Sequence, residues 1–304
     1  MLSDIAFSSI RIATPLVFAA LGGLYTFQAG ILNIALDGFM IVAAFAAVGA
    51  AFATGSLTMG VLAGVLASMA LAAVLALFNL RFRAHIFIAG IAVTFLAYGL
   101  TALLLKAIFD QDGVFASAAI PVFPALRIPG LADLPVLGPL LSGHTLLVYV
   151  AYLAVPVVAW TLYRTRWGLR VRMIGEAEDA ALAAGVNVDA IKLQTMVISG
   201  FFCGLGGAYL SLGYVSLFAK QMTDERGLIA LAAIFFAKGR PVATTLVALM
   251  FGVATALAVR LPQITGTAPQ LLQIIPYAAT ILALVIVGIR ANRSSTQNGW
   301  RFDT

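Results

Sequence analysis

Apolar runs of about 20 residues recur from one end of this 304-residue chain to the other. Such a run can cross the hydrocarbon of a bilayer as a helix, which pairs its own backbone N–H and C=O groups. We therefore expect an all-α polytopic transmembrane bundle of roughly 8–10 spanning or partly spanning helices, forming a single domain over 1–304. The expected spans are 9–27, 33–54, 57–79, 86–109, 144–163, 193–214, 242–260 and 271–289.

Composition excludes several classes of protein. The chain is 62% hydrophobic and 10% charged, whereas soluble domains are about half apolar and a quarter charged. Its one cysteine, Cys203, lies in an apolar run, and His85 and His144 stand far apart, so we expect no disulfide and no metal site. The sequence has no phosphate-binding loop and no metalloprotease or Ser/His/Asp motif. We therefore expect no catalytic residues, no ATP hydrolysis by this chain and no integral-membrane enzyme.

The distribution of charge predicts the orientation of the spans. Cytoplasmic loops are enriched in Lys and Arg. With the loop at about 164–192 in the cytoplasm, 12 of the 18 basic residues fall on that side, provided that 227–238 crosses the membrane. This predicts an external N-terminus and a cytoplasmic C-terminal tail at about 290–304. The net charge of +6 is thus expected to orient the spans beside membrane lipid rather than to bind nucleic acid.

Polar residues interrupt the second expected span. Asn33 and Asp37 stand four residues apart, which predicts one helix face, and Gly30 and Gly38 flank them. An acid within a span is expensive unless it faces a bundle interior or a watery cavity. We expect a structural role at the start of the span, with direct contact to a transported solute as the alternative.

A second interruption follows near the other end of the chain. Polar residues from Thr223 to Arg226 precede Gly227, and the apolar stretch 227–238 is too short for a full crossing, which favours a half-helix. Paired interruptions in opposite halves are typical of the substrate pathway of transporters. The candidate pathway residues are Asn33, Asp37, Gly38 and Gly227.

Two pairs of glycines are spaced for close approach of helices. Gly60 and Gly64, and likewise Gly200 and Gly204, form small-xxx-small pairs within expected spans. Such pairs let helix backbones approach closely in membranes. We expect them at packed interfaces of the bundle.

The stretch GEAEDAALAAGVN, residues 175–187, predicts a short helix in the long basic loop. Its acids, Glu176, Glu178 and Asp179, are expected in the first turn, where the helix dipole favours anions. Alanines and a leucine follow, and Gly185 is placed to end the helix. A helix of about nine residues is marginal alone and needs a surface to dock on, either another subunit or its own bundle.

Four segments together resemble a known family. They are AGILNIALDGFMIVAAFAA, GLRVRMIGEAEDAALAAGVNV, GFFCGLGGAYLSL and MTDERGLIALAAIFFAKGRP, in that order. The chain resembles the permease subunits of bacterial ABC importers for branched-chain amino acids, ribose-type sugars and nucleosides. It is most similar to the nucleoside or simple-sugar type.

This resemblance implies which partners the chain has and what it transports. It implies an ABC ATPase subunit that binds ATP and Mg, a second permease, identical or not, and an external substrate-binding lipoprotein, in the bacterial inner membrane. The short helix would couple to the ATPase, and a nucleoside or simple sugar would be imported, with a branched-chain amino acid as the alternative. A stand-alone ion-coupled transporter is a further alternative, although only Asp37 could carry its coupling ion. The residues implied in coupling are Gly175, Glu176, Asp179, Ala180, Ala181, Gly185 and Asn187.

Overall fold

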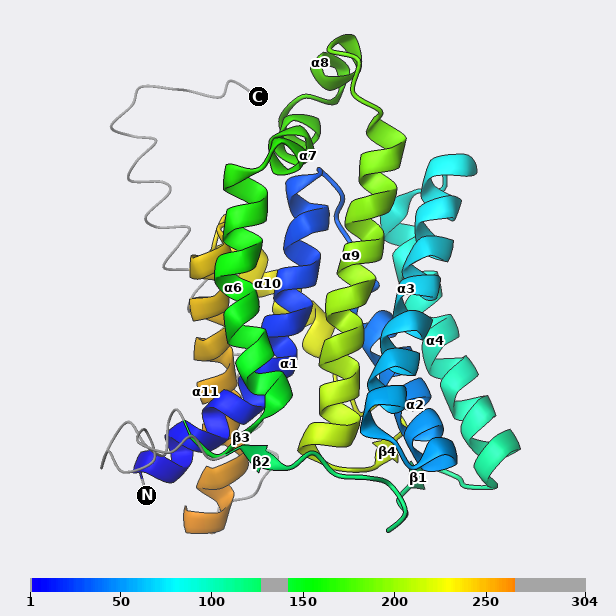
Figure 1. Cartoon of the computed structure of the whole chain (residues 1–304), viewed down its shortest axis with the longest axis vertical. Coiled ribbons are helices and arrows are strands. Elements are labelled where there is room, and N and C mark those ends of the chain that lie inside the picture. Colours follow the sequence, from blue (N-terminus) through cyan, green and yellow to red (C-terminus); the bar gives the residue numbers. More distant parts are fainter. Residues whose placement is uncertain (1, 127–141, 266–304) are drawn as a thin grey trace.

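The computed structural model describes residues 2–126 and 142–265, which form a bundle of long helices (Figure 1). Seven described helices are long and apolar enough to cross a membrane. The helices are α1 (Leu2–Gln28), α2 (Leu36–Thr54), α3 (Leu57–Arg81), α4 (Ile86–Phe109), α6 (Leu146–Arg164), α7 (Arg166–Glu176), α8 (Glu178–Ala183), α9 (Val188–Ala208), the π-helix Tyr209–Tyr214 that extends α9, α10 (Arg226–Phe236) and α11 (Pro241–Thr265).

Four two-residue strands complete the described structure. Strand β1 (Val114–Phe115) pairs antiparallel with β4 (Phe218–Ala219), and β2 (Ala125–Leu126) pairs antiparallel with β3 (His144–Thr145). The strands lie at the opposite end of the bundle from α7 and α8 (Figure 1). We name these two ends the strand end and the α7–α8 end.

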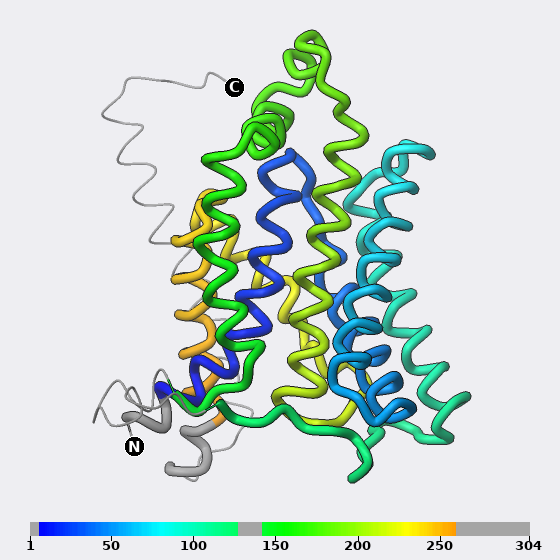
Figure 2. Tube along the Cα trace, viewed as in Figure 1, coloured from blue at the N-terminus to red at the C-terminus, as the bar shows by residue number. Residues whose placement is uncertain are grey.

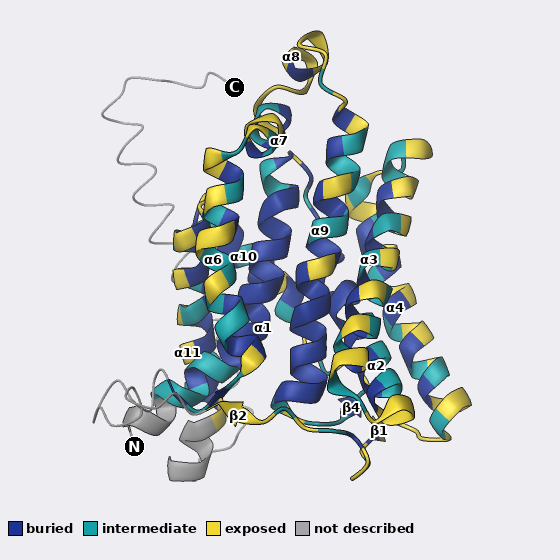
Figure 3. Ribbon diagram, in the orientation of Figure 1, coloured by how far each residue is buried: buried dark blue, intermediate teal, exposed yellow. Residues whose placement is uncertain are grey.

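Helices α1 and α9 form the centre of the bundle. In their most apolar stretches 78% and 83% of residues are buried, against 28% in α4 and α6. Figure 3 shows the same contrast, with α1 and α9 mostly buried and many exposed residues on the outer helices. Large apolar side chains are among these exposed residues, for example Leu66, Phe95 and Leu153. Because lipid is as apolar as these side chains, their exposure is expected of a membrane bundle.

The predicted glycine pairs lie at helix–helix contacts. A Cβ on Gly60 or Gly64 would lie 2.8 Å from a carbonyl oxygen of α2. A Cβ on Gly204 would lie 2.7 Å from the Cα of Val65 in α3, and Gly200 is equally close to α3. These distances leave no room for a larger residue, and the prediction of packed interfaces is confirmed.

Most expected spans match described helices, with three differences of three or more residues in their starts. The first helix begins at Leu2 rather than at residue 9, the second at Leu36 rather than at 33, and the sixth at Val188 rather than at 193. The short segment expected at 227–238 is the 11-residue helix α10. The expected span at 271–289 and the tail at 290–304 lie outside the described residues.

Two interrupted segments enter the bundle from opposite ends. After α1 the chain turns beneath α7 and returns into the bundle as the extended segment 29–35 (Figure 2). The segment 215–225 starts beside β1 at the strand end, where β4 pairs with it, and leads to α10. Helix α10 then runs to the α7–α8 end, where Gly239 contacts Gln28 at the end of α1. The segment and α10 together therefore carry the chain from one end of the bundle to the other.

Candidate functional site

The two interrupted segments meet at Asp37, in the first turn of α2. Its carboxylate Oδ1 accepts a hydrogen bond from the backbone N–H of Gly227 at 2.9 Å, and Oδ2 accepts one from Thr223 Oγ1 at 2.9 Å. The hydroxyl of Tyr98 in α4 also donates to Oδ2. The side chain is buried, and all these partners are donors. Asp37 therefore joins α2, α4 and the start of α10.

Helix dipoles explain why an acid is tolerated at this depth. Gly227 lies in the first turn of α10, whose N-cap residue, Glu225, gives no side-chain capping bond. Asp37 supplies the missing acceptor from another helix, and it also lies in the first turn of its own helix. Two positive helix ends thus face one carboxylate, the arrangement that stabilises an anion.

Glycines allow the close approach that these bonds require. A Cβ on Gly227 would lie 2.7 Å from the Cα of Asp37, and a Cβ on Gly38 would lie 2.9 Å from the Cα of Thr94 in α4. Three of the four candidate pathway residues, Asp37, Gly38 and Gly227, are therefore together where α2, α4 and α10 meet.

Asn33, the fourth candidate, lies apart from this group. The prediction that it shares a helix face with Asp37 is wrong, because residues 31–35 are not helical. Its Oδ1 accepts from the backbone N–H of Ala35 at 3.0 Å, a local bond that competes with helix formation. Its Nδ2 donates to Ser199 Oγ in α9 at 3.2 Å. Asn33 therefore fastens the extended segment to the central helix.

A cavity of about 630 Å³ opens beside the Asp37 cluster. Small-molecule sites commonly measure about 300–1,000 Å³. Apolar and aromatic groups share the wall with polar ones, and three of the polar side chains, Gln221, Asp224 and Glu225, form no hydrogen bond or ion pair with the rest of the described chain. The lining residues are Ile34, Asp37, Phe87, Ile91, Thr94, Phe95, Tyr98, Gln221, Asp224, Glu225 and Leu228.

The contribution of α4 was not predicted from the sequence. Phe87, Ile91, Thr94 and Tyr98 recur every three or four residues and so share one face of the helix. The polar Thr94 and Tyr98 on that face are the only signal in an otherwise ordinary apolar span. Among residues 2–126 and 142–265, no group of three or more His, Cys, Asp or Glu side chains could hold a metal ion.

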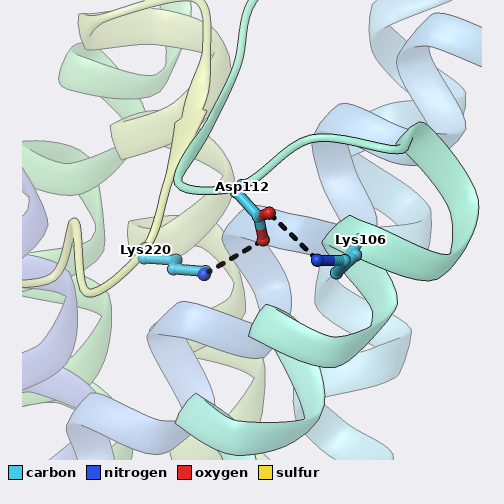
Figure 4. A network of polar contacts seen from close by, with 3 residues as sticks. All are labelled: Lys106, Asp112 and Lys220. Carbon is cyan, nitrogen blue, oxygen red and sulfur yellow. Dashed lines mark hydrogen bonds and ion pairs between the residues drawn. The ribbon is translucent and has the colours of Figure 1, made fainter.

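An exposed ionic network lies at the strand end (Figure 4). Lys106 Nζ lies 3.0 Å and Lys220 Nζ 3.9 Å from carboxylate oxygens of Asp112. The hydrogen bond and charge of Lys106, with a smaller contribution from Lys220, hold the pKa of the Asp112 carboxyl below its ordinary value. Lys220 N–H also donates to Gly113 O at 2.8 Å. The end of α4 is thereby tied to the segment that leads to Thr223 and the cavity.

The predicted acidic helix is two helices. Helix α7 ends at Glu176 and α8 begins at Glu178, with Ala177 extended between them. The prediction that Glu176 opens the helix is therefore wrong. Gly175 also belongs to α7, whereas Glu178 and Asp179 do lie in the first turn of α8. The break places these two acids at a new helix start, where the dipole favours them.

Helix α8 projects from the bundle and is mostly exposed (Figure 3). Gly185 follows its end with a left-handed φ of +75°, and the N–H groups of Gly185 and Val186 donate to the carbonyls of Leu182 and Ala181. This is the glycine-dependent stop that was predicted. Ala181 is buried and Ala180 exposed, while the Asn187 side chain caps α9 by accepting from Ala190 N–H at 3.0 Å.

Comparison with known proteins identifies relatives over nearly the whole chain. The family described as "Branched-chain amino acid transport system / permease component" matches residues 5–284. The guanosine ABC transporter permease protein NupQ of Bacillus subtilis is 34% identical over 93% of this chain and 92% of its own. The nucleoside ABC transporter permease protein NupC of Lactococcus lactis is 31% identical (90% and 89%), and the putative glucose ABC transporter permease protein TsgC13 of Haloferax volcanii is 33% identical (93% and 91%). No solved structure matches.

Proposed function

The chain belongs to the permease component family of branched-chain amino acid transport systems, and from that premise we propose that it imports a neutral nucleoside or simple sugar. It is a multi-pass membrane permease of an ABC transporter and works with other ABC components. The named solutes of its relatives, guanosine, nucleosides and glucose, support this class of solute. The single observation that carries the proposal is the cavity beside Asp37, because its lining matches such a solute.

The lining of the cavity supports a polar ring-shaped solute without negative charge. Phe87, Phe95 and Tyr98 offer rings that can pack against a base or a sugar face. The carboxylates of Asp224 and Glu225 can accept hydrogen bonds from hydroxyl groups. With Asp37 they make the lining acidic, which disfavours phosphorylated solutes. Because Asp37 already accepts three hydrogen bonds, we assign solute contact to Gln221, Asp224 and Glu225, and assign Asp37 to holding the wall together.

The α7–α8 end is proposed to face the cytoplasm and to bind the ATPase, which holds ATP and Mg. Most described basic residues lie at this end, in agreement with the positive-inside rule. They are Arg81, Arg83, Arg164, Arg166, Arg170, Arg172, Lys192, Lys238 and Arg240. The first helix starts at the opposite end, which supports an external N-terminus in a bacterial inner membrane. The exposed α8 supplies the docking helix, with Asp179, Ala180 and Gly185 on or beside it.

The strand end is then the side from which a substrate-binding lipoprotein delivers the solute. A second permease, identical or related, is proposed to complete the pathway. ATP binding would favour the state in which the two ATPases are close together and so shift the population of permease conformations.

Uptake into membrane vesicles tests this function. Vesicles with the chain alone should not take up radiolabelled guanosine or glucose. Vesicles that also contain the ATPase, the second permease and the binding lipoprotein should do so only with ATP. Gradient-driven uptake by the chain alone would overturn the proposal in favour of an ion-coupled transporter.

The proposed solute contacts are tested in the same assembly. The double change Asp224→Asn and Glu225→Gln should lower uptake on the order of tenfold, since two charged acceptors are lost. Asp110→Asn, an exposed acid outside the cavity, is the matched control and should have no effect. Equal uptake by both variants would exclude Asp224 and Glu225 as solute contacts.

A further inference from the structure

The end of α1 meets α7 through a contact between backbones. A Cβ on Gly175 would lie 3.0 Å from both the carbonyl carbon of Gln28 and the amide nitrogen of Gly30, and it would overlap the carbonyl oxygen of Gln28. Gly30 turns the chain there with a φ of +75°. We propose that Gly175, Gln28, Gly30 and Gly239 form a joint that transmits motion of α7 to the cavity, an inference that rests on the proposed function.

Helix α7 is fastened to its neighbours on the bundle side. Trp167 Nε1 donates to Gln194 Oε1 in α9 at 2.7 Å, and Arg172 Nε donates to the carbonyl of Leu162 in α6 at 3.2 Å. Gly168 packs directly on the last turn of α6. The bundle-side face of α7 is therefore held by several contacts at once. A displacement of α8 by a docked subunit would move α7 as a body rather than unwind it.

The same joint holds the far end of α10. Gln28 Nε2 donates to the carbonyl of Gly239 at 2.6 Å. Gly239 has a φ of +67°, and a Cβ there would lie 2.8 Å from the ring of Phe27. The Phe27 and Phe235 rings meet edge to face, with centroids 5.4 Å apart. The turn after α10 is thus fixed to the end of α1, directly beside Gly175.

Two segments lead from the joint to Asp37. One is the extended segment 29–35, which ends at the first turn of α2. The other is α10, whose first turn donates the Gly227 N–H to the Asp37 carboxylate. Both segments carry cavity-lining residues, Ile34 on the first and Leu228 on the second. A shift of α7 at the joint therefore moves two walls of the cavity together.

The backbone nature of the Gly175 contact makes it suited to transmission. A side-chain contact can be absorbed by a change of rotamer, whereas two backbones in contact must move together or separate. The alternative role of the Gly175 contact is purely structural, to stabilise the end of the bundle without transmitting motion. A structural contact would not affect the response of the cavity to ATP.

The test uses the complete transporter in vesicles with Leu228→Cys as a reporter, a cavity-lining residue that is not one of the proposed solute contacts. The native Cys203 is buried. The rate of labelling of the reporter by a membrane-impermeant maleimide is measured without nucleotide and with ATP. In the otherwise native chain we expect ATP to change this rate. With Gly175→Ala added, we expect the ATP-dependent change and the import rate to fall on the order of tenfold, while the ATPase stays bound.

Gly49→Ala is the matched control, because a Cβ at this helical glycine of α2 meets only Phe109 at 3.7 Å, an ordinary contact, and should leave both quantities unchanged. A normal ATP response in Gly175→Ala would overturn the joint. If the Gly175→Ala variant fails to bind the ATPase, the same measurements are made with Gln28→Leu. This change removes only the hydrogen bond from Gln28 to Gly239. The response of this variant should fall roughly threefold to tenfold, and an unchanged response would overturn the joint. An unsubstituted assembly that neither imports nor responds to ATP would instead overturn the proposed function.

Discussion

At the scale of the residue, Asp37 shows how a buried acid can be stabilised without a cation. Three donors from three parts of the chain, Tyr98, Thr223 and the Gly227 amide, surround its carboxylate, and two helix starts face it. If the acid were removed, the Gly227 amide would lose its acceptor, and Tyr98 and Thr223 would keep only the 3.3 Å contact between their two hydroxyl groups. The acid therefore holds the interrupted segments together.

Replacing Asp37 with Asn tests this role. The amide keeps the size of the side chain but removes its charge, and its NH₂ group faces donors instead of accepting from them. We expect the free energy of unfolding to fall by about 1–3 kcal/mol. The loss should appear as a lower melting temperature of the purified chain in detergent. Asp110→Asn, an exposed acid outside this cluster, is the control; equal melting of both variants would contradict the role of Asp37.

At the scale of the element, two short helices depend on contacts beyond their own hydrogen bonds. Helix α8 has six residues and α10 has 11, both below the length at which an isolated helix is stable. Helix α10 is supported by Asp37 at its start and by the end of α1 at its other end. Helix α8 has less support within the bundle: Ala181 is its one buried residue, and Glu178 forms an ion pair with Lys192 at 2.7 Å. This difference favours α8 as the helix that docks on another subunit.

Gly185 offers a prediction for α8. Its Cβ position is open, so a substitution acts through the left-handed φ alone. Gly185→Val should destabilise the end of α8 by about 1–2 kcal/mol, whereas Asn tolerates this conformation. We expect Gly185→Val to lower ATPase co-purification or ATP-driven uptake with membrane insertion intact, and Gly185→Asn to retain most of both. If Val and Asn behave alike, α8 does not depend on this stop for coupling.

At the scale of the whole molecule, the cavity is open on the α4 side of the chain. Phe95 is 70% exposed, and Asp224 and Glu225 are exposed beside it. Acids within a membrane bundle face a partner or a watery cavity rather than lipid. A second permease against α4 would enclose the cavity and shield these acids.

Photo-crosslinking tests the position of this second permease. A benzophenone side chain at Phe95 should crosslink to a polypeptide of the size of a permease when both permeases and the ATPase are present. The control is Leu153 on α6, which is equally exposed at 68%. Crosslinks at Leu153 in place of Phe95 would put the second permease on the other side of the bundle.

The sequence alone was enough to predict the class, the seven long apolar helices within the described residues, the short helix near 227–238 and the family. These features depend on local composition, because each apolar run must be buried in lipid or protein wherever it lies. The glycine stop at Gly185 and the acids of α8 also follow local rules. The start of α2 could not be predicted in the same way, because residues 31–35 are mostly apolar, like the span that follows. They are not helical because Gly30 turns the chain with a positive φ and Asn33 binds Ser199 in α9.

Only the tertiary structure decided where the polar residues meet. Asp37 and Gly227 are 190 residues apart, and their bond depends on how two interrupted segments pack against α4. The same packing selects one face of α4 as a cavity wall and brings Gly175 against Gln28. Local hydrophobicity determines which segments enter the membrane. The order in which helices pack depends on shape and hydrogen bonding between distant residues, which no local pattern contains.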